Sequence, residues 1–148
     1  MNNQLTENFQ QVKDAISVPN ASGWTNIAEA LLVGRTELSS SRANPRAALV
    51  MVLLSDGKTN TRINGPGGQD NGKPPGNPSE QQSLEQAQLA AQNGITLYTI
   101  SLGTSTNQPL MNSMAVATGG RHFYSPTTAQ LDDIFEEISA RVPTTLVE

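Results

Sequence analysis

The sequence has no cysteine, one histidine and few basic residues, and each shortage excludes a class of function. Without cysteine there are no disulfides, no thiolate metal sites and no cysteine nucleophile. Nine Lys and Arg residues against thirteen Asp and Glu residues give a formal net charge of -4. This balance argues against nucleic acid or anionic lipid as the main partner, because both are bound by clustered positive charge. His122 has no serine or cysteine nucleophile in a recognisable turn nearby, which favours packing or exposure over catalysis.

Long apolar runs are missing as well. No stretch approaches the roughly 18 consecutive apolar residues of a membrane-spanning helix, and residues 1–4 have neither the basic nor the apolar part of a signal peptide. Only 36% of the 148 residues are apolar, which indicates a modest core for this length. The sequence therefore predicts a single domain, residues 1–148, with no membrane span in this chain.

The most informative stretch that is present is the apolar run at 47–54, which ends at Ser55-Asp56-Gly57. A short, unbroken run rich in Val and Leu is typical of a strand buried on both faces of a parallel sheet, and a buried helix segment is the competing interpretation. Ligands of open parallel sheets bind beyond the carboxyl ends of the strands. Asp56 stands at that end and is the first candidate for chemistry.

Helix and strand patterns alternate after this run. Helices are predicted at 6–18, 24–38, 79–93, 109–118 and 127–142, and further strands at 95–102 and 121–125. Such alternation implies a parallel sheet with right-handed crossovers. We therefore predict an α/β fold, a Rossmann-like three-layer sandwich with about three parallel strands and helices on both faces.

Apolar stripes and capping residues specify the faces and ends of these helices. Predicted N-terminal caps are Thr6, a capping box that begins at Ser79, and Thr127 with Gln130. The acidic pairs 132–133 and 136–137 are predicted to form the solvated face of the last helix. The predicted buried stripes are Phe9, Val12 and Ile16 in the first helix and Leu131, Ile134, Phe135, Ile138 and Val142 in the last.

Residues 59–78 are predicted to form a flexible loop, because glycine and proline interrupt any regular pattern there. Asn and Asp residues in this loop offer oxygen atoms, but their spacing does not match an EF-hand and only one carboxylate is present. The loop does not match a GxxxxGK[ST] or GxGxxG phosphate-binding pattern either. A solvated insertion is the favoured interpretation.

Four stretches together resemble the von Willebrand factor type A (VWA) domain, in the order of that family and over nearly the whole chain. They are GWTNIAEAL at 23–31, VMVLLSDGKTN at 50–60, QAQLAAQNGITLYTISLG at 86–103 and ATGGRHFYSPTTAQLDDIFEEI at 117–138. Among family members, the chain is similar to bacterial tight-adherence (Flp-type) pilus-assembly and surface VWA proteins. The resemblance implies a non-enzymatic module for protein binding, adhesion or pilus assembly, located outside the cytoplasm or in the cell envelope.

The resemblance also implies a metal-ion-dependent adhesion site built from three loops. Thr25 corresponds to the second-loop Thr of the family, and Asp56 to the third-loop Asp. The Asp-x-Ser-x-Ser motif of the first loop is absent, as are the first three strands and first helix of the family, so we expect a truncated domain or dependence on another segment. Mg²⁺ or Mn²⁺ is expected in the complete domain, with an acidic group of a protein partner as a further ligand, and weak or no binding by this chain alone.

Other interpretations remain open at this stage. Thr25 is also suited to cap a helix, and Asp56 to a turn. A small phosphate- or nucleotide-handling α/β enzyme that uses Asp56 is the alternative function, which phosphate-ester activity lost in Asp56→Ala would favour. A cation-dependent protein partner would favour the binding module, and a fragment with no independent function is a third hypothesis. The apolar strand at 50–54 is expected to form an open sheet edge, through which the chain could self-associate.

Overall fold

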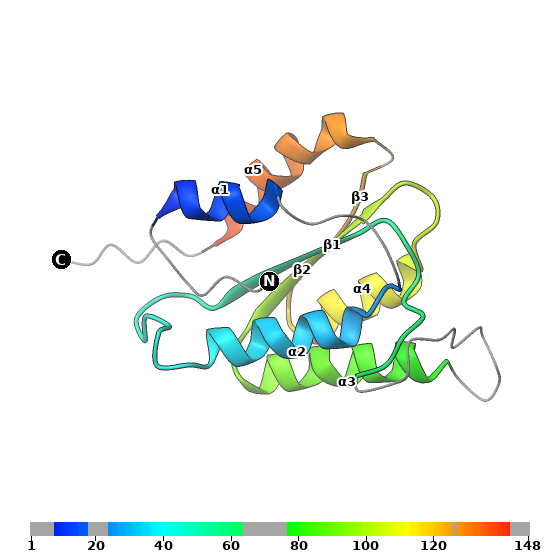
Figure 1. Ribbon diagram of the computed structural model, residues 1–148, viewed down its shortest axis with the longest axis horizontal. Helices are drawn as coiled ribbons and strands as arrows, with labels where there is room; N and C mark the ends of the chain where they lie inside the picture. Colours follow the sequence, from blue (N-terminus) through cyan, green and yellow to red (C-terminus); the bar gives the residue numbers. More distant parts are fainter. Residues whose placement is uncertain (1–7, 18–23, 64–76, 126, 143–148) are drawn as a thin grey trace.

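The structure, a computed structural model, describes residues 8–17, 24–63, 77–125 and 127–142. Within these residues, three parallel strands form one sheet in the order β1-β2-β3, with helices on both faces (Figure 1). The predicted α/β fold is confirmed. The elements in chain order are α1 (Phe9–Ser17), α2 (Ile27–Leu38), β1 (Val50–Ser55), α3 (Pro78–Gln92), β2 (Thr96–Leu102), α4 (Gln108–Ala117), β3 (His122–Ser125), a 3-10 turn (Thr128–Gln130) and α5 (Leu131–Arg141).

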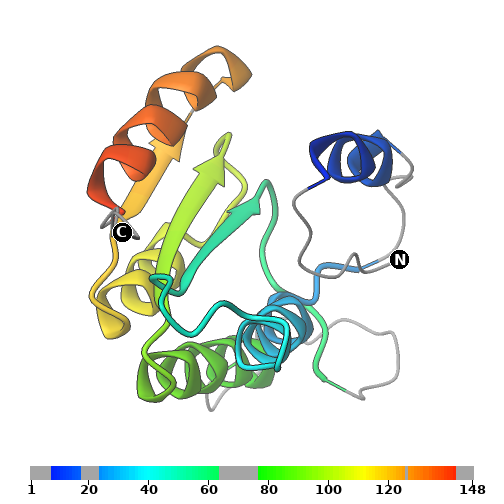
Figure 2. The same cartoon turned by 90° about the vertical axis from the view of Figure 1, so that its left-hand side faces the viewer.

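The central strand β2 determines how the layers are stacked. It pairs with β1 from Val50–Thr96 to Ser55–Ser101, and its carboxyl half pairs with β3. Since side chains alternate along a strand, its odd-numbered residues face α2, α3 and α4, while its even-numbered residues face α5. Figure 2 shows these layers, with α2, α3 and α4 on one side of the sheet and α5 on the other.

Each face of the sheet carries its own apolar core. On the face of α2, α3 and α4, the buried cluster consists of Ile27, Leu31, Ala87, Leu97, Leu110, Met111 and Met114. On the face of α5, the buried cluster consists of Tyr98, Ile100, Phe123, Ile134 and Ile138, with Val50, Leu131 and Val142 packed against it. The predicted stripes of α4 and most of that of α5 therefore lie where the periodicity placed them.

The strand β1 differs from its prediction. It was expected to be buried on both faces, but 38% of Val52 and 45% of Leu54 are exposed. The prediction is wrong because β1 is an edge strand, and α5 covers only the neighbouring part of this face over β2 and β3. In the part of the chain that the structure describes, no strand pairs with the outer edge of β1.

Two aromatic residues predicted to be buried are exposed. Phe9 in α1 is 80% exposed and Phe135 in α5 is 45% exposed. The periodicity correctly predicted both helices, but the sheet reaches only one side of α5, which Ile134 and Ile138 occupy. Thr6 and the side chain of Ile16 lie outside the described residues.

Three helices begin with an asparagine cap, and at α2 and α3 these caps stand in place of the predicted hydroxyl residues, Thr25 and Ser79. The Oδ1 atoms of Asn26, Asn77 and Asn107 accept hydrogen bonds from Glu29 N at 3.0 Å, Ser79 N at 3.2 Å and Leu110 N at 3.2 Å. The capping-box prediction at Ser79 is therefore wrong, since α3 begins before it. The predicted cap of the last helix, Thr127 with Gln130, is also wrong. Gln130 itself stands at the cap position of α5, and its side chain makes no capping hydrogen bond.

The turn between α4 and β3 requires both of its glycines. Gly119 has φ of 75°, a left-handed conformation that ends the helix at little cost only without a Cβ atom. A Cβ atom on Gly120 would lie 2.0 Å from the carbonyl oxygen of Leu97 in β2. The predicted stop at 119–120 is confirmed, and the second glycine also lets the turn approach the central strand.

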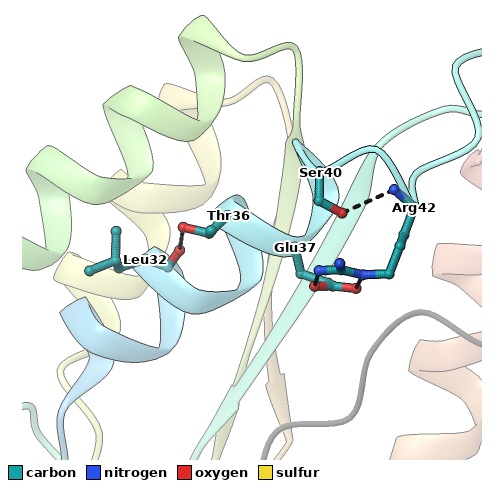
Figure 3. Close-up of polar contacts among 5 residues, drawn as sticks. All are labelled: Leu32, Thr36, Glu37, Ser40 and Arg42. Atoms are coloured by element: carbon teal, nitrogen blue, oxygen red, sulfur yellow. Dashed lines mark hydrogen bonds and ion pairs between the residues drawn. The ribbon is translucent and has the colours of Figure 1, made fainter.

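At its carboxyl end, α2 leads into a polar turn toward β1 (Figure 3). The Arg42 guanidinium donates to both carboxylate oxygens of Glu37, with Nε 2.9 Å from Oε1, and this pairing raises the pKa of Arg42. The backbone N–H of Arg42 donates to Ser40 Oγ at 3.3 Å. These contacts lie at the opposite end of α2 from its N-cap, Asn26.

Candidate functional site

The segment that follows β1 is held against the residue that precedes the cap of α2. The backbone N–H of Thr25 donates to Asn60 Oδ1 at 2.8 Å, and the backbone N–H of Asn60 donates to the carbonyl of Thr25 at 2.9 Å. Thr59 Oγ1 donates to the same carbonyl at 3.3 Å. Two loops that are 35 residues apart in sequence are thus joined at the carboxyl end of the sheet.

These contacts bring the two predicted site residues to the same place. A Cβ atom on Gly57 would lie 3.3 Å from Thr25 Oγ1, so the Thr25 hydroxyl faces the residue next to Asp56. Ser55 Oγ donates to the carbonyl of Gly57 at 3.1 Å and accepts from its N–H at 3.4 Å, which closes the turn. Asp56 itself is exposed.

Neither side chain is committed to another role among the residues that the structure describes. Asn26 caps α2, so the interpretation of Thr25 as the N-cap is wrong, and its hydroxyl forms no hydrogen bond with described residues. The Asp56 carboxylate likewise has no hydrogen-bond or ion-pair partner in that part of the chain. Both groups remain available to a ligand.

The first residues of α3 and α4 are hydrogen-bonded to each other and to the segment after β1. Ser79 Oγ donates to Asn77 Oδ1 at 2.6 Å and lies 3.3 Å from the carbonyl of Thr59. Asn107 Nδ2 donates to Glu80 Oε1 at 2.8 Å and so links the first turns of the two helices. Through Thr59, this network continues to Thr25.

Thr25 and Asp56 offer oxygen ligands of the type that a hard divalent cation prefers, but two ligands are too few for its coordination shell. Hydroxyl and carboxylate oxygens are the ligands that Mg²⁺ and Mn²⁺ prefer, and Thr25 and Asp56 supply one of each. Magnesium requires an octahedral shell of oxygen atoms. Among the described residues, no group of three or more His, Cys, Asp or Glu residues could hold a metal ion. Two protein donors leave most of such a shell to water or to another ligand.

His122 takes no part in this arrangement. It begins β3, and its Nδ1 atom lies 3.0 Å from Thr99 Oγ1 and 3.3 Å from the carbonyl oxygen of the same residue. Thr99 Oγ1 in turn donates to the carbonyl of Met111 in α4 at 2.9 Å. Burial lowers the pKa of His122, so the neutral imidazole is favoured. These contacts agree with packing, one of the two roles that the sequence favoured over catalysis.

Thr59 and Asn60 were not predicted as site residues, because the sequence placed them in a flexible loop. Thr59 is buried and Asn60 is half-buried, and both hold Thr25 in place. The one signal in the sequence is the concentration of Thr and Asn immediately after Gly57. Residues 64–76 of the same loop lie outside the described residues, so its flexibility there remains a prediction.

Comparison with known proteins identifies related folds. A family model described as von Willebrand factor type A domain matches residues 2–137. A von Willebrand factor type A protein from Catenulispora acidiphila is 20% identical, with TM-score 0.68, over 93% of this chain and 28% of that chain. Proximal thread matrix protein 1 from the mussel byssus, with a zinc-occupied MIDAS motif, is 22% identical, with TM-score 0.58, over 87% of this chain and 28% of that chain. BatB from Bacteroides thetaiotaomicron is 14% identical, with TM-score 0.62, over 91% of this chain and 70% of that chain.

These likenesses support the fold and not a specific activity, because all three identities are low. The chain spans 28% of the length of the Catenulispora and mussel proteins. A search of curated proteins found no significant match. In the described part of the chain, no helix is long and apolar enough to cross a membrane.

Proposed function

This chain belongs to the von Willebrand factor type A domain family, and from that premise we propose that it is a non-enzymatic module for protein binding, adhesion or pilus assembly. Domains of this family act in general as interaction modules. The proposed contact region is the carboxyl edge of the sheet, where Thr25 and Asp56 lie. A location in the cell envelope or outside the cytoplasm is part of the same proposal.

One observation carries this proposal: the Thr25 hydroxyl faces Gly57, the residue next to Asp56. The two residues belong to loops far apart in sequence, and Asn60 and Thr59 hold those loops together through several hydrogen bonds. The juxtaposition supports a shared ligand for the two oxygen donors.

We assign Thr25 and Asp56 as the residues that would hold a divalent cation, Mg²⁺ or Mn²⁺. When bound, such a cation supplies positive charge that attracts an acidic group of a protein partner. The tethered loop keeps the Thr25 hydroxyl oriented toward the turn, while the exposed Asp56 carboxylate adds negative charge there. Because two donors are few, we expect the chain alone to bind the cation weakly or not at all.

The experiment is a thermal melt of the full chain in EDTA and in millimolar MnCl₂, with the same measurements on Thr25→Ala, Asp56→Ala and the control Asp133→Ala. Saturation at about 100 times the dissociation constant would stabilise the fold by roughly 2.7 kcal/mol. We expect at most a small rise in melting temperature that disappears in both site variants and persists in Asp133→Ala. A rise of equal size in all four proteins would overturn the assignment.

We further propose that the chain self-associates through the open edge of β1. An unpaired strand edge without charged side chains is a template for another strand, and β1 has none from Val50 to Ser55. Sedimentation velocity should detect concentration-dependent dimers that Val52→Lys weakens, because a charge on an edge strand opposes pairing. A monomer that melts cooperatively at high concentration would contradict this part of the proposal.

A further inference from the structure

The turn between α3 and β2 contains an Asn-Gly pair. Three such pairs occur in the sequence, at 64–65, 71–72 and 93–94, and the last of them lies among the described residues. Asn93 is the C-cap of α3, and Gly94 follows it with φ of 71°. Both residues are exposed, and outside its chain neighbours no atom lies within 4 Å of the Cβ position of Gly94. Solvent therefore reaches this turn.

An Asn-Gly pair can lose ammonia in a reaction between its own side chain and its backbone. The glycine nitrogen forms a bond to Cγ of the asparagine, the Cγ–Nδ2 bond breaks, and the amide nitrogen leaves as ammonia with the proton of the glycine N–H. Water then opens the resulting succinimide ring at one of its two carbonyl groups, which gives aspartate or isoaspartate. Glycine favours this reaction because it has no side chain to hinder the approach of its nitrogen.

The folded turn holds the Gly94 nitrogen away from the Asn93 side chain. Ring closure requires Cβ of Asn93 and the Gly94 nitrogen to be eclipsed about the Cα–C bond, which at an L-residue corresponds to ψ of about −120°. The ψ angle of Asn93 is 7°. Because the required angle lies outside the main allowed regions of an L-residue, the reaction needs the turn to open and the backbone to rotate.

Hydrogen bonds restrain both reacting groups. The N–H of Gly94 donates to the carbonyl of Ala91 at 3.0 Å, and Nδ2 of Asn93 donates to Ser39 Oγ at 2.9 Å. Ser39 is the C-cap of α2, which lies beside α3 (Figure 1). The Asn93 side chain therefore joins the carboxyl ends of two helices, and both of these bonds must break before the ring can close.

We propose that Asn93 is a site of spontaneous deamidation that the fold protects, so that its conversion to aspartate or isoaspartate proceeds through opening of the α3–β2 turn. The local sequence favours the reaction, whereas the backbone angle and the hydrogen bonds oppose it. Local openings of this kind differ in free energy from one part of a protein to another, and the rate at Asn93 reports the opening of this turn. The inference does not depend on the proposed cation site, because the turn lies at the amino edge of the sheet.

The reaction would weaken the junction between α3 and β2. Either product places a carboxylate at the carboxyl end of α3, where the helix dipole disfavours negative charge. Isoaspartate also adds one carbon to the main chain before Gly94, which displaces the following N–H groups from the helix carbonyls. One of these is the N–H of Ile95, which donates to the carbonyl of Ala90 at 3.0 Å. Because Ile95 is buried directly before the central strand, the start of β2 would be loosened.

The test incubates the full chain at mildly alkaline pH, either folded in buffer or unfolded in urea, and follows each Asn-Gly pair by peptide mapping with mass spectrometry. A synthetic peptide of residues 89–98, with and without urea, corrects for any effect of urea on the chemistry. We expect Asn93 to react at least about tenfold more slowly in the folded chain, a ratio that an opening free energy of about 1.4 kcal/mol already produces. Equal rates in the folded and unfolded chain would overturn the proposal.

A variant of the restraining contact tests the role of Ser39. Ser39→Ala removes the acceptor for Nδ2 of Asn93, so the reaction in the folded chain should be about twofold to fivefold faster, with no change in urea. Ser40→Ala is the matched control, because Ser40 Oγ accepts from the N–H of Arg42; it should leave the rate at Asn93 unchanged. Circular dichroism should confirm that both variants are folded. Equal rates in the two variants would contradict the role of Ser39.

A second variant tests the consequence of the reaction. Asn93→Asp has the same side chain as one product and should lower the melting temperature by about 1–4 °C, because it adds negative charge at the carboxyl end of α3. Asn112→Asp is the control, since it makes the same charge change at an exposed position in the middle of α4. Equal melting temperatures of the two variants would overturn the weakening of the junction.

Discussion

The two faces of the sheet are made from the same strands but are covered to different extents. Three helices, α2, α3 and α4, cover one face, and the residues between them and the sheet, such as Leu97, Met111 and Met114, are almost fully buried. One helix, α5, covers the other face and leaves part of β1 exposed. We call these the closed face and the open face.

Residue type did not decide which side chains of β1 are buried. Met51 and Leu53 face the closed side and are partly buried against its core. Val52 and Leu54 alternate with them, are equally apolar, and are more exposed. The hydrophobic effect favours burial of all four, but only the residues that meet a helix achieve it. Stability should therefore depend more on the closed face than on the open face.

The largest expected loss of stability comes from a cavity-creating substitution in the core of the closed face. Met114 is fully buried in its core, so Met114→Ala should lower the free energy of unfolding by about 2–5 kcal/mol. Phe135→Ala on the open face removes a larger side chain but should cost less than about 1 kcal/mol, because that ring is half-exposed. Urea denaturation monitored by circular dichroism measures both. Similar losses of unfolding free energy in the two variants would contradict the proposed difference between the two faces.

The next effect tests how the α4–β3 turn approaches the sheet. A Cβ atom in Gly120→Ala would lie within 2.0 Å of the Leu97 carbonyl oxygen, which requires the backbone to move. We expect a loss of about 1–3 kcal/mol, comparable to overpacking a core. Gly94→Ala is the control, since no atom lies within 4 Å of its Cβ position. It carries only the strain of its positive φ, so a loss as large as that of Gly120→Ala would contradict the proposed clash.

A smaller effect separates the cap of α2 from the candidate site beside it. Asn26→Ala removes the bond to Glu29 N and should destabilise the chain by about 1 kcal/mol. Thr25→Ala leaves that bond and the backbone contacts to Asn60 in place, so its effect on stability in EDTA should be smaller. Thermal melts of the two variants measure the difference. The reverse order would make Thr25 the structural residue and weaken its assignment to the cation site.

The smallest effect is a pH dependence from the closed face, where His122 contacts Thr99. Burial lowers the pKa of His122, so the unfolded chain binds its proton more readily than the folded chain. Stability from this residue should be complete above its ordinary pKa and should fall as the pH drops below that value. Melts from pH 5 to 8 should show this slope in the native chain, and a reduced slope in His122→Gln. An unchanged slope in the variant would assign it to other groups.

Much of the fold could be predicted because local patterns specify it. The helix α4 buries Leu110, Met111, Met114 and Ala115 as their spacing predicts, and Gly119-Gly120 ends it. The strand β2 also follows the predicted apolar run. Errors occurred where burial depends on a distant neighbour: β1 lacks a covering helix, and Phe135 lies on a flank that the sheet does not reach.

The candidate site was only partly predictable for the same reason. The resemblance to a family indicated Thr25 and Asp56, but the hydrogen bonds of Asn60 and Thr59 to Thr25 have no local signature. Residue type alone did not predict which residues cap the helices. Ser and Thr are good capping residues, yet asparagines occupy the positions at which these helices begin. A shift of one or two residues in a helix start decides which side chain reaches the free N–H groups.

By itself, the sequence determined the alternation of strands and helices, the parallel sheet and the glycine-ended turns, because these follow from the periodicity of neighbouring residues. Only the tertiary structure decided which apolar faces are covered and which polar side chains meet at the carboxyl edge. Burial and juxtaposition depend on contacts between residues far apart in the chain. The closed face, the exposed part of β1 and the pairing of Thr25 with the turn at Asp56 all have this origin.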